Sequence, residues 1–163
     1  MSFANKGEEK FKEWLEYKKY SYIYFDQGQD TFSSLFLNNV KRPDFLVLID
    51  SIGLIAVDVK SRNKLVIYNN SGKSEGRFTL NENEDTKKLL AFERRFRIPV
   101  WIVFCLGSEE CETWYWISLS EIVEHFTIIE KPKISSPFRG IPIKSCKTIG
   151  WEDGLFKLFG NYL

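Results

Sequence analysis

Three charged residues flank two strongly apolar segments, and their types are those of a metal-assisted hydrolytic site. Asp44 precedes the apolar segment 45–49, whereas Asp58 and Lys60 lie at the end of the apolar segment 54–59. Side chains alternate between the two faces of a strand, so Asp58 and Lys60 project from the same face. Isolated buried charges are costly, so such a cluster needs mutual pairing or a metal ion.

Two adjacent carboxylates repel each other, which raises the pKa of one of them. A divalent cation resolves this conflict, and hard oxygen ligands suit Mg²⁺ or Mn²⁺, which also accept phosphate oxygens. We therefore expect Asp44 and Asp58 to ligate the metal, with the backbone carbonyl of Val59 as a further ligand. Water on such an ion has a lowered pKa and becomes a nucleophile near neutral pH. Lys60 would orient that water, or neutralise charge growing on phosphorus in the transition state.

The two apolar segments indicate a hairpin buried in the middle of a sheet, because both are rich in Val, Ile and Leu. With a turn of three or five residues, Asp44 lies opposite Lys60 or Asp58 and shares their face. With a turn of four residues it lies opposite Val59, and a bulge or the strand end must redirect it. Pro43 cannot donate a hydrogen bond to a ladder, so it marks the start of the first strand.

Other elements surround this hairpin. The sequence predicts helices at 7–17, 82–96 and 118–126, a short helix at 153–159, and strands at 22–25, 64–68, 99–105 and 114–117. Residues 69–76 are rich in Gly, Ser and Asn, which favours a loop, and the segment from 126 onward is expected to be mostly irregular. The order predicts one α/β domain over 1–163, with a central mixed β-sheet flanked by helices.

Composition narrows the function classes. The net charge is +1, so there is no global basic signal for nucleic acid, although an acidic site can offset a local basic patch. The single histidine excludes His-rich metal sites. Three cysteines without C-x-x-C spacing argue against a disulfide framework or a zinc site, and Cys105 is expected to be inert core. No apolar leader is present and no apolar run approaches the roughly 18 residues of a membrane span, so a cytoplasmic location is expected.

The motif Pro43-Asp44, followed by Asp58-Val59-Lys60, resembles the signature of the PD-(D/E)XK nuclease superfamily, which includes restriction endonucleases and Holliday-junction resolvases. The resemblance covers residues 7 to 117. It implies a restriction-endonuclease-like core. It also implies an acidic residue in the opening helix GEEKFKEWL that completes the metal site. Glu8 is the first candidate for this role and Glu9 the second.

The resemblance further implies a Mg²⁺- or Mn²⁺-dependent endonuclease that hydrolyses DNA, duplex or branched, by in-line attack of water. Lys41, Arg42 and Arg62 would contact the DNA backbone. Gln27 belongs to the loop between the first strand and Asp44, near the expected site. A homodimer is a further expectation, because one domain of this size would reach only one strand.

Each assignment has an alternative. Asp44, Asp58 and Lys60 could form a structural ion pair at a strand end. Glu8 could be a first-turn carboxylate favoured by the helix macrodipole, and the basic residues could belong to a solvated loop. The alternative function is a non-catalytic nucleic-acid- or protein-binding module on the same fold, although three charges at a buried edge are costly for such a module. An unrelated α/β hydrolase or transferase lacks a G-x-S-x-G, P-loop or G-x-G-x-x-G motif.

Overall fold

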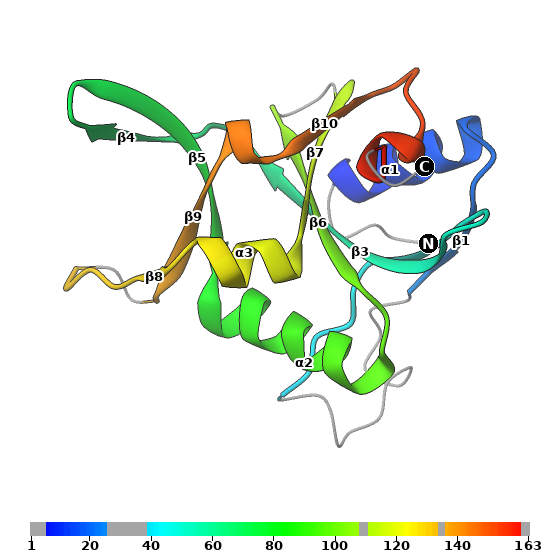
Figure 1. Cartoon of the computed structure of the whole chain (residues 1–163), viewed down its shortest axis with the longest axis horizontal. Coiled ribbons are helices and arrows are strands. Elements are labelled where there is room, and N and C mark those ends of the chain that lie inside the picture. The colour runs from blue at the N-terminus through cyan, green and yellow to red at the C-terminus, as the bar shows by residue number, and fades with distance from the viewer. Residues whose placement is uncertain (1–5, 26–38, 108–110, 134–135, 161–163) are drawn as a thin grey trace.

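The computed structural model describes residues 6–25, 39–107, 111–133 and 136–160 of the chain (Figure 1). Its helices and helical turns are α1 (Lys6–Tyr17), the π-helical turn η2 (Glu82–Thr86), α2 (Lys87–Phe96), α3 (Leu119–His125), and the 3₁₀ turns η3 (Ile143–Ser145) and η4 (Leu155–Leu158). Its strands are β1 (Ser21–Tyr24), β2 (Phe45–Ile49), β3 (Gly53–Arg62), β4 (Val66–Asn70), β5 (Lys73–Asn81), β6 (Val100–Leu106), β7 (Thr113–Ser118), β8 (Ile128–Ile129), β9 (Phe138–Pro142) and β10 (Lys147–Gly150).

The main sheet has the strand order β1-β2-β3-β6-β7-β10. Strand β3 is parallel to β6, and every other neighbouring pair in this sheet is antiparallel. Helix α1 covers one face of the sheet, whereas α2 and α3 cover the other. The predicted class, a central mixed sheet flanked by helices, is therefore confirmed.

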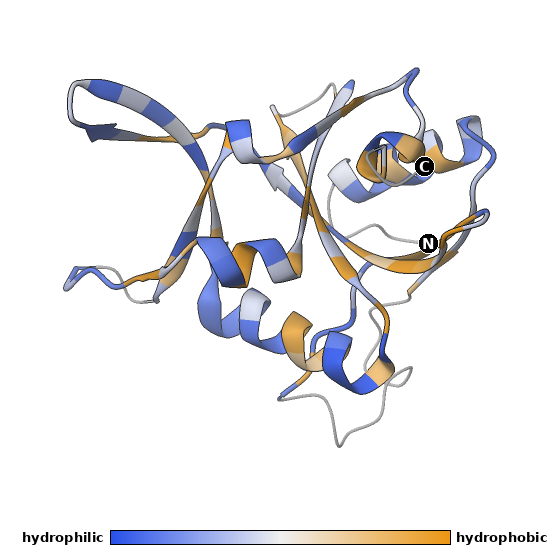
Figure 2. Cartoon of the chain, viewed as in Figure 1, coloured by the Kyte–Doolittle hydropathy of each residue, from blue (hydrophilic) through white to orange (hydrophobic). Residues whose placement is uncertain are grey.

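Strand β3 lies in the middle of the core and divides its side chains between the two faces. Val57 and Val59 pack with Phe11 and Trp14 of α1, whereas Ala56 packs on the side of α2. Apolar residues of α1 recur at helical spacing, which gives this helix one buried face. Figure 2 shows the hydrophobic residues running along β3 and β6, in keeping with strands that are covered on both faces.

The turn of the β2–β3 hairpin fixes its register. Ile49 pairs with Gly53, so three residues, 50–52, form the turn. Ser51 and Gly53 adopt positive φ angles of 66° and 122° there. The structure therefore has one of the two turn lengths that keep Asp44 on the face of Asp58, and the four-residue alternative does not occur.

A second sheet, with the order β4-β5-β9-β8, was not expected from the sequence. The prediction of a loop over 69–76 was wrong except at the turn, because β4 runs to Asn70 and β5 starts at Lys73. Ser71 and Gly72 have positive φ angles of 52° and 78°, a combination that suits a two-residue hairpin turn. The segment after residue 126 was expected to be irregular, yet it supplies β8, β9 and β10.

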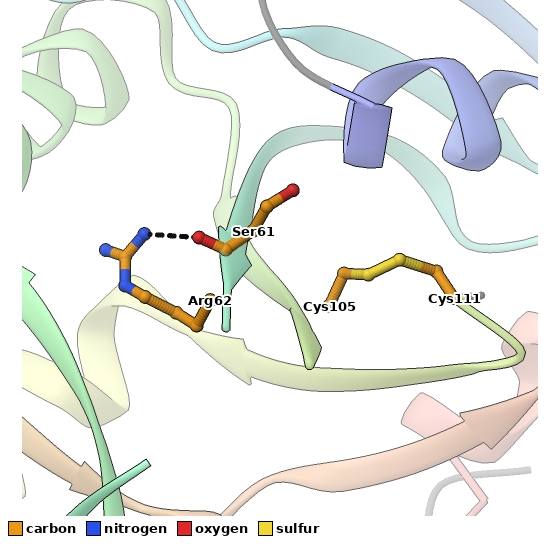
Figure 3. The surroundings of a disulfide bond; sticks show 4 residues. All are labelled: Ser61, Arg62, Cys105 and Cys111. Atoms are coloured by element: carbon orange, nitrogen blue, oxygen red, sulfur yellow. Dashed lines mark hydrogen bonds between the residues drawn. A yellow bond between two sulfur atoms is a disulfide. The ribbon is translucent and has the colours of Figure 1, made fainter. Parts of the chain in front are cut away.

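Cys105 and Cys111 form a disulfide with a Cα–Cα distance of 5.6 Å (Figure 3). The prediction against a disulfide was therefore wrong, because an odd number of cysteines does not prevent one local bridge. The bridge spans the connection between β6 and β7, and Cys146 remains as a buried free thiol. Across the described ranges, no helix has the length and apolarity of a membrane span.

Candidate active site

Asp58 and Lys60 lie where β3 extends beyond its partner β2. The first pair of the ladder joins Phe45 to Val57, so β3 continues from Asp58 with only β6 beside it. Lys60 Nζ lies 2.9 Å from Asp58 Oδ2, which places both side chains on the predicted common face. Asp58 is fully buried, whereas the Lys60 side chain is 14% exposed. The ion pair thus has its carboxylate in the interior and its ammonium group closer to the surface.

Asp44 stands one residue before β2 and is fixed by three hydrogen bonds. Its backbone N–H donates to the carbonyl of Val57 at 2.9 Å, and its own carbonyl accepts from Phe25 N–H at 2.9 Å. Its Oδ2 accepts from the backbone N–H of Val59 at 2.7 Å. The carboxylate thereby takes the place of the next ladder bond, which β2 is too short to supply.

The backbone N–H and C=O of Val59 face the side of β3 on which the Asp44 carboxylate lies. The N–H and C=O of one strand residue point to the same side. Because the Val59 N–H meets Asp44, the Val59 carbonyl also faces the side on which β2 has ended. This position suits the further oxygen ligand that the sequence predicted.

Glu8 approaches the site from α1. It is buried, and its Oε2 accepts a hydrogen bond from Tyr24 Oη at 3.0 Å. Burial raises the pKa of Asp44 well above its usual range, and the charges of Asp58 and Glu8 raise it further. The Val59 N–H and Lys60 offset only part of this rise. Three carboxylates therefore interact here, whereas Glu9, the second candidate, is exposed.

Four side chains form what we call the charge ring: Asp58, Lys60, Asp85 and Lys41. Lys60 Nζ lies 2.9 Å from Asp58 and 2.8 Å from Asp85, and Lys41 Nζ lies 2.6 Å from Asp85 and 3.6 Å from Asp58. Burial alone would lower the pKa of Lys60, but Asp58 and Asp85 outweigh it and raise that pKa. Burial would likewise raise the pKa of Asp85, but Lys60 and Lys41 lower it. The ring thus favours the charged form of Lys60 and of Asp85.

Asp58 is nevertheless incompletely satisfied. Among the described residues, neither of its buried carboxylate oxygens receives a hydrogen bond of good geometry. Lys60 is close enough for an ion pair, but its ammonium does not meet the directional requirement of a hydrogen bond. A fully buried carboxylate in this state retains unused ligand capacity.

The donor set fits a hard divalent cation. Asp44, Asp58 and the Val59 carbonyl offer only oxygen atoms, and Mg²⁺ is commonly bound through one or two protein carboxylates with water completing its shell. In the part of the chain that the structure describes, no group of three or more His, Cys, Asp and Glu side chains is arranged to hold a metal ion. These residues would therefore fit such an ion only with water completing most of its shell.

The predicted DNA-contacting residues have contacts within the protein. Lys41 belongs to the charge ring, and Arg42 is buried and has partners of its own. Arg62 donates to the carbonyl of Thr79 at 2.9 Å. It also donates to the carbonyl of Ser61 at 3.0 Å (Figure 3). Burial lowers its pKa, although Asp85 and Asp58 oppose this effect. Gln27 lies outside the described residues.

Sequence reasoning missed Asp85 and Tyr24. The acidic run 82–85 before a helix was a signal that some acidic residue lies near the sheet. It did not identify which one, because Glu84 is exposed and pairs with Lys88, whereas Asp85 turns inward. Nothing in the spacing of Tyr24 indicated its hydrogen bond to Glu8.

No protein-family model and no curated protein matches the chain. Among solved structures, the chain is similar to Hjc, a Holliday junction resolvase from the archaeal hyperthermophile Archaeoglobus fulgidus, with 16% sequence identity and a TM-score of 0.47. The similarity covers 86% of this chain and 94% of that chain. It concerns the fold alone and says nothing of activity in this chain.

Proposed function

We propose that this chain is a divalent-metal-dependent nuclease that hydrolyses phosphodiester bonds of DNA, duplex or branched. The observation that carries the proposal is the carboxylate of Asp58, which is fully buried and receives no well-directed hydrogen bond from the part of the chain that the structure describes. It lies beside Lys60, and its charge raises the pKa of Asp44. Asp44 and Asp58 are thus two buried carboxylates close enough for the charge of one to raise the pKa of the other, and a bound cation would relieve this repulsion.

Asp44, Asp58 and the Val59 carbonyl would hold Mg²⁺ or Mn²⁺, and Glu8 would assist directly or through a water molecule. When bound, the ion lowers the pKa of water and offsets charge on the phosphate. The chain prepares this site in advance, because the Val59 N–H orients Asp44 and the Tyr24 hydroxyl orients Glu8. Such fixed dipoles reduce the reorganisation that the reaction requires.

Lys60 would stabilise the negative charge that develops on the phosphate in the transition state. Its pKa is raised, so it stays cationic at neutral pH, and its side chain is partly exposed at the edge where a phosphate can approach. Lys41 would contact the DNA backbone from the neighbouring position in the charge ring. Arg42, Arg62 and Gln27 are proposed as further backbone contacts, and a homodimer would bring two such sites to the two strands.

The test is cleavage of end-labelled duplex, four-way junction and single-stranded DNA in Mg²⁺ or Mn²⁺. Wild type, Asp58→Ala and Lys60→Ala are compared with Asp50→Ala, which alters an exposed acid in the turn of the same hairpin. We expect losses of at least about 100-fold for the two site variants and none for the control. Equal activity in wild type and Asp58→Ala would contradict the proposal.

Metal titration distinguishes the enzyme from a binding module. We expect calorimetry or Mn²⁺ electron paramagnetic resonance to detect a bound ion in wild type. The affinity for the ion should be lower in Asp58→Ala. DNA binding without any metal uptake at Asp58 would instead indicate a non-catalytic nucleic-acid-binding module.

A further inference from the structure

A fourth carboxylate reaches the proposed site from a different element. Asp85 lies in η2, and its Oδ1 contacts both ammonium groups, Lys60 at 2.8 Å and Lys41 at 2.6 Å. We propose that Asp85 is a positioning residue that holds these two lysines at the edge of the site. This inference rests on the proposed function, since it assigns Asp85 a role in presenting cations to a phosphate.

The contact distances favour Asp85 as the principal anchor. It lies 2.6 Å from Lys41 Nζ, whereas Asp58 lies 3.6 Å from it, and the two carboxylates are similarly close to Lys60 Nζ, at 2.8 and 2.9 Å. If the carboxylate of Asp58 ligates a cation, the attraction between Asp58 and Lys60 weakens. Asp85 is then the carboxylate that still directs Lys60 toward the cleavage site.

Hydrogen bonds and an ion pair hold η2, the turn that carries Asp85, in place. The Asn81 side chain accepts from the backbone N–H of Glu84 at 2.8 Å, and the Thr86 hydroxyl donates to the Asn81 carbonyl at 3.4 Å. Glu82 forms a buried pair with Arg139 of β9 at 2.7 Å. Both ends of the turn are therefore tied to the second sheet.

Helix α2, which follows η2 directly, contributes to the position of Lys41. The backbone N–H of Lys41 donates to the carbonyl of Lys88 in α2 at 3.2 Å, so its segment is attached one turn beyond Asp85. Within η2, Glu84 is exposed whereas its neighbour Asp85 faces the charge ring. Single π-helical turns are rare and frequently occur at functional sites.

The first measurement does not depend on activity. In ¹⁵N-labelled protein, ammonium protons that are held in ion pairs exchange slowly and give visible Nζ signals. We expect signals for Lys60 and Lys41 in wild type, assigned by their loss in Lys60→Arg and Lys41→Arg. They should broaden or vanish in Asp85→Asn and persist in Glu84→Gln, a matched control from the same turn. Unchanged signals in Asp85→Asn would overturn the proposal.

The second measurement is DNA cleavage. We expect kcat to fall about 10- to 100-fold in Asp85→Asn, the range typical of groups that orient a metal site, with KM little changed. Asp85→Glu should recover part of the rate, which a purely structural role would not predict. A kcat equal to or above wild type in Asp85→Asn would overturn the proposal, because Asp85 would then compete with the phosphate. If wild type cleaves no DNA, the proposed function fails, while the Nζ signals still decide the role of Asp85.

Discussion

The carboxylate of Asp44 accepts a hydrogen bond from the backbone N–H of Val59 at 2.7 Å, so a side chain just before β2 extends the hydrogen bonding between β2 and β3. This residue therefore has two separable properties, a hydrogen-bond acceptor and a negative charge. The acceptor contributes to the stability of the fold, and the charge contributes to the proposed metal site.

Asp44→Asn and Asp44→Ala should separate these two properties. Both variants lose the charge, so both should lose metal-dependent cleavage. Only alanine leaves the buried N–H of Val59 without its acceptor, which costs about 1–3 kcal/mol. We therefore expect Asp44→Ala to have a lower free energy of unfolding in urea than Asp44→Asn by this amount. Equal stability of the two variants would show that the hydrogen bond contributes nothing.

Rising pH should destabilise the metal-free protein through Asp44. Its folded-state pKa lies well above the ordinary aspartate value of 3.8, so the unfolded chain releases this proton first as the pH rises. The stability that the protonated Asp44 carboxyl contributes to the folded protein is fully present below pH 3.8. It is lost as the pH rises through the folded-state pKa. Urea unfolding in a chelator should show wild type losing stability relative to Asp44→Asn across this window, and Mg²⁺ should reverse the loss. Parallel pH profiles for the two proteins would contradict this.

The buried pair of Glu82 and Arg139 should contribute strongly to the fold. Glu82→Gln leaves the Arg139 charge buried and unpaired, which costs about 3–5 kcal/mol. Glu84→Gln, which removes an exposed i,i+4 pair with Lys88, should cost about 0.5 kcal/mol or less. Chemical denaturation of both variants gives the comparison. Similar small losses in both would mean that Arg139 finds compensation elsewhere, for instance from the Phe126 carbonyl that it already contacts at 2.6 Å.

Reduction should destabilise the protein by about 2 kcal/mol, because the bridge between Cys105 and Cys111 closes a short loop. The urea transition should shift with reductant in wild type and not in a Cys105→Ala/Cys111→Ala variant. Thiol titration of the denatured chain gives an independent check. It should find one thiol, Cys146, before reduction and all three cysteines afterwards, since two of the three form the bridge. Three thiols before reduction would contradict the bridge.

The sequence allowed the central hairpin to be predicted because its information is local. Two apolar runs, a short turn and Pro43 at the strand start locate the two strands, and β2 spans the predicted residues 45–49. They left the turn length open, so the register came from the structure. The common face of Asp58 and Lys60 then follows from strand alternation alone. The predicted strand at 114–117 is likewise confirmed by β7, in which Trp114 and Trp116 are fully buried.

The remaining features depend on contacts between distant residues. Strand β5 has only Phe78 and Leu80 fully buried, so its pattern is weak without its partner β9. Asp85 joins the charge ring through Lys60, 25 residues away, and Lys41, 44 residues away. Arg139 is 57 residues from Glu82. Spacing along one chain gives no register for such pairs, and only the folded arrangement of the two sheets brings them together.

The ribbon formed by β4 and β5 separates Lys60 from Asp85 along the chain without separating them in space. Figure 1 shows this ribbon reaching away from the body of the molecule. Its far end turns at Ser71 and Gly72, whereas its near end is fixed by the pairing of Asn81 with Phe138. Residues can therefore be added or removed at the tip, or a peptide inserted there, without moving Asp85. The geometry of the charge ring is therefore expected not to depend on the length of this ribbon.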